Sequence, residues 1–247
     1  VLKLRLGTGL GYVSHPFDRL TNTKNNVIGS HLNGFVNIRF TTVARLTKSL
    51  NMTAGIGFSH ASNGAYKTPN LGLNMVTMNL GLDYVFGNRQ CIYRKDSIPR
   101  CEKEWLPSLI IVTGYKELEQ PSALYPAYGL QLNLYRKLNY KNSLGGGLEM
   151  SYSNAVKQSW IRDSLSSPSF GQIAQAGAKW IYAFHVGNLS LPIDFGMYIY
   201  KKQSYNGEFF HRIGLRYLLK DRIILNFTLL SHWAKADYFE WGVGYQF

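Results

Sequence analysis

Residues 76–86 read Val-Thr-Met-Asn-Leu-Gly-Leu-Asp-Tyr-Val-Phe, and apolar and polar side chains alternate through most of this stretch. Successive side chains of a β-strand point to opposite faces, so a period of two predicts a strand with one apolar and one polar face. The same alternation recurs in residues 2–12, 193–200 and 223–229. The sequence therefore predicts an all-β protein.

Two fold classes share this alternation, the soluble β-sandwich and the transmembrane β-barrel. The expected strands are about 10–13 residues long, which is enough to cross a bilayer at a tilt. Their polar faces are rich in Gly, Asn and Gln, and aromatic residues gather near their ends, as in the girdles of membrane barrels. The last segment, residues 239–247, alternates and ends in Phe, which resembles the C-terminal signal of bacterial outer-membrane barrels. We expect a transmembrane, antiparallel, up-and-down β-barrel.

We expect about twelve strands in one barrel domain over residues 1–247, or fourteen if further strands precede residue 1. Bacterial single-chain barrels have an even number of strands. The expected strands are residues 1–13, 32–46, 50–61, 75–87, 105–115, 124–136, 142–153, 172–187, 189–200, 208–219, 221–231 and 237–247. If the C-terminus is periplasmic, the connections alternate between short periplasmic turns and longer extracellular loops. The N-terminal residues alternate instead of forming the apolar core of a signal peptide, so we expect a mature form or a fragment.

One long connection breaks this alternation of loop lengths, and it contains Cys91 and Cys101. In an oxidising compartment a disulfide between them would hold the connection compact. Two free thiols are the alternative.

The composition narrows the choice of partners. Lys and Arg number 27 against 14 Asp and Glu, a net charge of +13, which points to an anionic partner. Composition alone leaves nucleic acid, phosphorylated lipid and an acidic membrane face open; in a membrane barrel the charge favours phosphorylated lipid, and we expect no nucleic acid. Because no CxxC or His-rich spacing suggests zinc and the glycine-rich residues 7–11 lack the Lys-Ser/Thr ending of a phosphate loop, we expect no metal and no cofactor.

His60 and Ser62 lie two residues apart in an expected strand, so their side chains share one face, at the outer end of its apolar row. A histidine beside a serine is the minimum arrangement for base-activated acyl transfer. On spacing alone, an interfacial histidine without a chemical role is the competing interpretation.

The surrounding residues favour the chemical interpretation. The stretch His60-Ala61-Ser62-Asn63-Gly64, followed by Pro69-Asn70-Leu71-Gly72-Leu73-Asn74, resembles the motif of outer-membrane lipid A deacylases (the acyloxyacyl hydrolase family), most of all the larger members from Bacteroidetes-type bacteria. The motif match covers residues 60–74, and the barrel pattern extends it loosely over the whole chain.

This resemblance implies an integral outer-membrane hydrolase of Gram-negative bacteria. Its substrate would be lipid A of lipopolysaccharide in the outer leaflet, from which it removes an ester-linked acyl chain. By position in the motif, Ser62 is the nucleophile, His60 the general base and Asn70 an oxyanion donor. Asn63 is expected to support the site by capping the loop turn through its side chain.

The acid position of the motif falls on Asn74, where the family has a carboxylate. Asn can accept a hydrogen bond from His60 and orient the ring, but it supplies no negative charge to stabilise the imidazolium. Two interpretations follow: an enzyme that works with Asn74 as orienting residue, or an inactive barrel that serves as a structural or assembly subunit of an outer-membrane complex.

A narrow channel is a third interpretation, which would require an open lumen. We expect instead that charged residues on the lumenal faces pair across a largely filled interior. Among these residues are Glu149, Lys179, Asp194, Arg212, Arg216 and Glu240.

Overall fold

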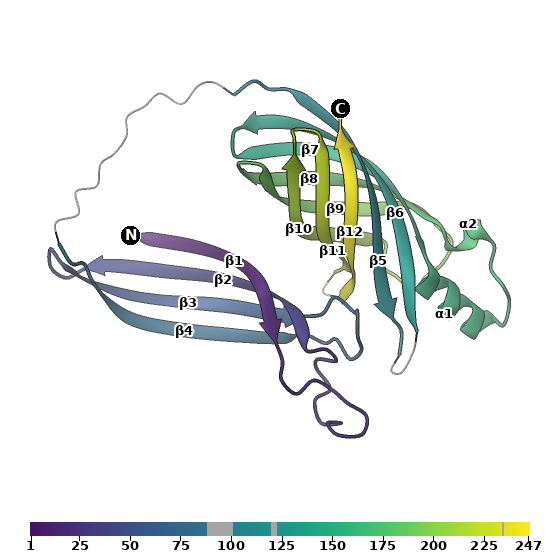
Figure 1. Ribbon diagram of the computed structural model, residues 1–247, viewed down its shortest axis with the longest axis horizontal. Coiled ribbons are helices and arrows are strands. Elements are labelled where there is room, and N and C mark those ends of the chain that lie inside the picture. Colours follow the sequence, from purple (N-terminus) through teal and green to yellow (C-terminus); the bar gives the residue numbers. More distant parts are fainter. Residues whose placement is uncertain (88–100, 120–122, 234) are drawn as a thin grey trace. The chain divides into compact units, whose positions relative to one another are not determined.

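The computed structural model describes residues 1–87, 101–119, 123–233 and 235–247 (Figure 1). The chain divides into two compact units. Unit 1 contains residues Val1–Asn63 and Lys67–Ile98, and unit 2 contains Gly64–Tyr66 and Pro99–Phe247. A single domain over residues 1–247 stays a prediction.

Unit 1 is an antiparallel sheet of four strands in the order β1-β2-β3-β4. These are β1 (Leu2–Tyr12), β2 (Leu32–Arg45), β3 (Leu50–Ser62) and β4 (Leu73–Tyr84). The alternation seen in the sequence becomes two different faces, since Met78 is 86% and Leu80 78% exposed on β4, whereas Asn79 and Gly81 between them are less exposed. The apolar row is therefore an outer surface and not a soluble core.

Unit 2 is a closed antiparallel barrel of eight strands. Its strands are β5 (Trp105–Glu117), β6 (Leu124–Asn139), β7 (Asn142–Ser153), β8 (Gln175–Val186), β9 (Leu189–Lys201), β10 (Phe209–Leu219), β11 (Ile223–His232) and β12 (Lys235–Gln246). Each strand pairs with its neighbours in sequence, and β12 closes the barrel on β5, with Val243 opposite Ile111. The topology is up-and-down, as expected.

The structure corrects the expected size of the barrel. All twelve expected segments are strands within the described residues, but the barrel that closes contains eight of them, because β5 pairs with both β6 and β12. A single barrel of twelve strands is thus not what the structure contains. Alternation identifies the two faces of a strand, but it does not identify which strands close on one another.

Charged side chains cross-brace the interior of the barrel, as the sequence predicted. Arg212 of β10 donates to Glu240 of β12 at 2.7 Å and to Glu149 of β7 at 2.6 Å. Lys179 of β8 donates to Asp194 of β9 at 2.8 Å, and Arg216 lies 3.3 Å from the same carboxylate. Three cations and three carboxylates are buried together here. An eight-stranded barrel is just wide enough for side chains to fill it.

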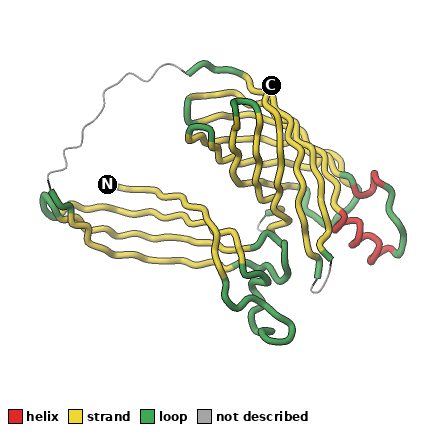
Figure 2. The backbone as a smooth tube through the Cα atoms, in the orientation of Figure 1, coloured by secondary structure: helices red, strands yellow, loops and turns green. Residues whose placement is uncertain are grey.

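Two helices interrupt the connection between β7 and β8, where only a loop was expected. They are α1 (Asn154–Ser164) and α2 (Phe170–Ile173), and they lie at the end of the barrel away from the C-terminus (Figure 2). Among the described residues, no helix has the length and hydropathy needed to cross a bilayer. Of the expected disulfide pair, Cys91 lies outside the described residues.

Candidate functional site

The core of the candidate site is a side-chain pair across β3 and β4. Their antiparallel register sets His60 directly opposite Asn74. His60 Nδ1 and Asn74 Oδ1 lie 2.7 Å apart, within hydrogen-bond distance. Residues 14 positions apart in sequence are thus brought together by the strand pairing, and Asn74 takes the place expected for the residue that orients the histidine.

This contact determines which ring nitrogen is free to act as a base. When the Asn74 oxygen accepts, the proton is on His60 Nδ1 and Nε2 carries the lone pair. A base that takes a proton from a serine needs that tautomer. The pair therefore orients the imidazole as the Asp of a Ser-His-Asp triad does, without its negative charge.

Ser62 follows His60 by two residues on β3 and lies opposite Gly34 of β2. Its side chain is on the same face of the strand as His60, as predicted. Within the described part of the chain, no hydrogen bond joins Ser62 Oγ to His60. In hydrolases without substrate such contacts are often long and tighten when substrate binds.

Along the face of β3 that carries Phe58, His60 and Ser62, the exposure of the side chains falls toward the site. Phe58 is 43% exposed, His60 is half-buried and Ser62 is 5% exposed. The apolar wall therefore leads from open surface at Phe58 to a covered serine.

The two remaining motif residues build the loop that follows β3. The Asn63 side chain donates from Nδ2 to the Lys67 carbonyl at 2.8 Å, and its Oδ1 accepts from Lys67 N at 3.4 Å. Asn63 thus holds the turn, as predicted. The Asn63 N–H in turn donates to Asn70 Oδ1 at 2.9 Å.

That last hydrogen bond has a chemical consequence. Because a backbone N–H can only donate, the oxygen of the Asn70 amide must face Asn63, and Nδ2 faces the other way. Asn70 Nδ2 makes no hydrogen bond to any described residue. The Asn70 side chain is therefore fixed at its acceptor and retains a free donor, which is what an oxyanion donor requires.

A second loop, residues 13–31, supports Asn70 from behind. Ile28 forms an isolated antiparallel bridge with Asn70, and Leu71 N donates to the Val27 carbonyl at 3.0 Å. Gly29, in the loop of residues 13–31, lies so close to Thr68 that a Cβ added to Gly29 would be 2.4 Å from the Thr68 carbonyl oxygen. The backbone around Asn70 is thus held against the loop of residues 13–31.

Gly72 is a site residue for which the sequence predicted no role. Its φ is +76°, and a Cβ there would lie 2.6 Å from His60 Cε1 and 3.3 Å from His60 Nε2. Glycine is therefore required both for the backbone conformation and for the space that the imidazole occupies. The sequence did mark this position, because Gly72 belongs to the motif of residues 60–74, but only the strand register shows which side chain Gly72 faces.

Comparisons with solved structures find outer-membrane proteins at low similarity. The Pseudomonas putida toluene transporter TodX shares 11% identity at a TM-score of 0.26, over 99% of this chain and 78% of its own. A triple mutant of the Rhodopseudomonas blastica porin shares 9% identity at a TM-score of 0.22, with both chains fully covered. Salmonella typhi OmpF in complex with daunomycin shares 12% identity at a TM-score of 0.21, over 100% of this chain and 97% of its own. These scores are too low to support an argument about the fold. The comparison with curated proteins gave no match.

Family models account for both units. The model described as lipid A 3-O-deacylase (PagL) matches residues 1–83, which contain His60, Ser62 and Asn74. The model described as acyloxyacyl hydrolase, C-terminal domain, matches residues 105–247, more than half of the chain and all the strands of the closed barrel. The chain therefore belongs to the outer-membrane lipid A deacylase family, with a PagL region followed by the C-terminal domain of the acyloxyacyl hydrolases.

Proposed function

We propose that this protein removes an ester-linked acyl chain from lipid A, with Ser62 as nucleophile and His60 as general base. The observation that carries the proposal is the contact between His60 Nδ1 and Asn74 Oδ1 at 2.7 Å, because it leaves His60 Nε2 as the basic nitrogen. Membership in the lipid A deacylase family supports the substrate class.

The reaction follows the acyl-transfer scheme of serine hydrolases. His60 Nε2 takes the Ser62 Oγ proton as Oγ attacks the ester carbonyl, and Asn70 Nδ2 donates to the oxyanion of the tetrahedral intermediate. His60 then returns the proton to the departing sugar oxygen, which leaves an acyl group on Ser62. Water, deprotonated by His60, attacks this ester, and His60 then returns the proton to the departing Ser62 Oγ as the fatty acid is released.

Asn74 acts as a positioning residue in this scheme. It fixes the tautomer and the ring orientation of His60, but it cannot offset the positive charge of the imidazolium. The expected result is an enzyme slower than one with a carboxylate at this position.

The membrane orientation is part of the proposal. With the C-terminus in the periplasm, the connections at the other end of the closed barrel are extracellular, on the side of the outer leaflet. The ester-linked chains of lipid A reach the site by lateral diffusion from that leaflet.

The missing negative charge at Asn74 favours a second candidate, an inactive barrel that serves as a subunit of an outer-membrane complex. The two candidates differ in one assay, in which purified protein is reconstituted in vesicles that contain lipid A and the released fatty acid is measured. The proposal expects fatty acid release by the native protein and less than about one hundredth of that rate for His60→Ala, since base catalysis contributes about 10²–10⁴-fold. Equal rates for both proteins would overturn it.

A further inference from the structure

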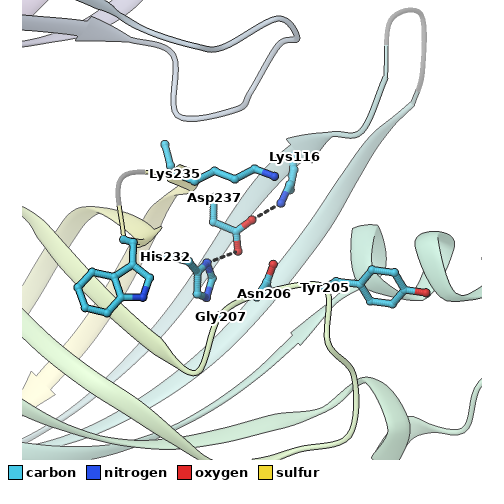
Figure 3. Close-up of a pocket in the computed structure, with 9 residues that line it drawn as sticks. Lys116, Tyr205, Asn206, Gly207, His232, Lys235 and Asp237 are labelled. Atoms are coloured by element: carbon cyan, nitrogen blue, oxygen red, sulfur yellow. Dashed lines mark hydrogen bonds and ion pairs between the residues drawn. The ribbon is translucent and has the colours of Figure 1, made fainter.

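A second polar site lies in unit 2, at the end of the closed barrel opposite the C-terminus. It is a pocket of about 120 Å³, large enough for several water molecules. Its lining comes from the end of β5, the loop between β9 and β10, Trp233, and the adjoining ends of β11 and β12 (Figure 3). The lining side chains include those of Lys116, Tyr205, His232, Trp233, Lys235 and Asp237.

Asp237 is the acceptor at the centre of the pocket, and its carboxylate has two partners. Lys116 donates to Oδ1, and His232 Nδ1 lies 3.6 Å from Oδ2. The other ring nitrogen of His232, Nε2, is 2.9 Å from the Tyr198 hydroxyl. Asp237 and His232 are both buried. The floor of the pocket is therefore a fixed polar framework in which the carboxylate is already neutralised by a lysine.

Lys235 adds a second positive charge to this framework. It is exposed, and within the described residues its ammonium has no ion-pair or hydrogen-bond partner. In Figure 3 the Lys235 side chain extends toward Lys116 and Asp237. The pocket is thus lined by two ammonium groups and one carboxylate, which leaves one positive charge and three N–H donors of Lys235 without an acceptor.

The loop that forms the opposite wall is tied down by another lysine. Lys201 Nζ donates to the carbonyls of Asn206 at 2.6 Å and Gly207 at 3.1 Å, and it pairs with Glu208 at 3.1 Å. Because the Lys201 ammonium already binds groups of this loop, Lys235 remains the donor that a ligand would engage.

We propose that this pocket binds the phosphate group of a phosphorylated glycolipid in the outer leaflet. A phosphate offers several strong acceptor oxygens on one small group, which matches donors that converge beside a neutralised carboxylate. Trp233 borders the pocket, and its indole provides apolar surface with a polar N–H for a sugar beside the phosphate, whereas the Tyr205 hydroxyl is already hydrogen-bonded to Asp163. The lipid is the source of this phosphate because the pocket opens at the barrel end that the proposed orientation places in the outer leaflet.

Binding at this pocket is separate from hydrolysis at Ser62, so the test uses binding alone. The full chain is folded in micelles of an amine-oxide detergent, which contains no phosphate, and it carries Ser62→Ala so that the lipid stays intact. Calorimetric titration compares three probes: phosphorylated lipid A, the same lipid A with its phosphates removed chemically, and inorganic phosphate. Lys235→Gln is compared with Lys202→Gln, a matched change at an exposed lysine of the β9–β10 loop that does not line the pocket.

The proposal expects Lys235→Gln to weaken the binding of phosphorylated lipid A about ten-fold and Lys202→Gln less than two-fold. Removal of the phosphates should weaken binding to the native pocket by a similar factor. Equal effects of the two lysine changes, or equal binding of the lipid without phosphates, would overturn the proposal. If inorganic phosphate binds as tightly as the lipid, the proposal that the bound phosphate belongs to a lipid is wrong. A protein that binds in this Lys235-dependent way but deacylates nothing would overturn the proposed function and leave this inference standing.

Discussion

His60 and Asn74 are cross-strand partners on β3 and β4, and their side chains meet at 2.7 Å between Nδ1 and Oδ1. A neutral amide thus occupies the place at which serine hydrolases of this kind carry an acid. The amide can perform one of the two tasks of that acid, which is to orient the ring, and it omits the other, which is to stabilise the imidazolium.

Replacing Asn74 by Asp should raise the rate of deacylation, because Asp has the same shape and adds the missing charge. We expect kcat to rise about ten-fold or more, given that the reverse change in a serine protease costs about 10⁴-fold. The measurement is the rate of fatty acid release from lipid A in vesicles. Asn74→Ala is the companion variant and should lose most of the native rate. A rate for Asn74→Asp at or below that of the native protein would show that charge is not what limits this site.

Gly72→Ala should inactivate the enzyme while the barrel still folds. The new Cβ would lie 2.6 Å from His60 Cε1, so the imidazole must move, and displacement of a catalytic group by about 1 Å can cost about 10²-fold in rate. Gly87→Ala is the matched control, since Gly87 also has a positive φ, +79°, but has no atom within 4 Å of the added Cβ. Similar losses in the two variants would mean that backbone strain, and not the contact with His60, is responsible.

The strands of this protein could be predicted from its sequence to within a few residues. The expected strand at residues 142–153 coincides with β7, and the one at 105–115 ends two residues before β5 does. Alternation determines these segments because each strand has one exposed apolar face and one polar face. The sequence could not predict that the barrel closes with eight strands, since the pairing of β12 with β5 depends on how the whole sheet coils.

Helix α1 was missed for a related reason. Its residues Asn154–Ser164 lie between two strands and carry a mixed polar sequence, which predicts a loop as readily as a short helix. Tertiary contacts decide the outcome, because Ala155 and Val156 are buried.

The residues of the candidate site could be named from the motif, but their contacts could not. The spacing of His60 and Ser62 predicts that they share a face, which the strand confirms. The contact between His60 and Asn74 depends on the register of β3 and β4, and the role of Gly72 depends on where the loop returns.

The buried charges of the closed barrel should make it sensitive to the loss of a single partner. Arg212→Met leaves Glu240 without its cation and Glu149 with Lys179 alone, and breaking a buried pair on one side costs about 3–5 kcal/mol. We expect the free energy of unfolding, measured by urea titration in vesicles, to fall by about that amount. The control is Arg162→Met, whose exposed pairs with Glu119 and Asp163 should contribute less than about 1 kcal/mol. Equal effects at both positions would contradict a structural role for the buried network.

The closed barrel should not conduct ions. Side chains from β7, β8, β9, β10 and β12 meet across its interior in paired charges, which leaves little room for a hydrated ion. Planar-bilayer recordings of the purified protein should show no discrete conductance steps under conditions in which a porin shows them. Reproducible steps would revive the interpretation of the protein as a channel.

Lipid A from Gram-negative cells that express the protein tests the central claim most directly. Mass spectrometry should detect lipid A that has lost one ester-linked acyl chain in cells with the native protein. Cells with the same amount of folded Ser62→Ala protein should retain the intact lipid. Loss of the acyl chain in both strains, or in neither, would contradict the assignment of Ser62 as the nucleophile of a lipid A deacylase.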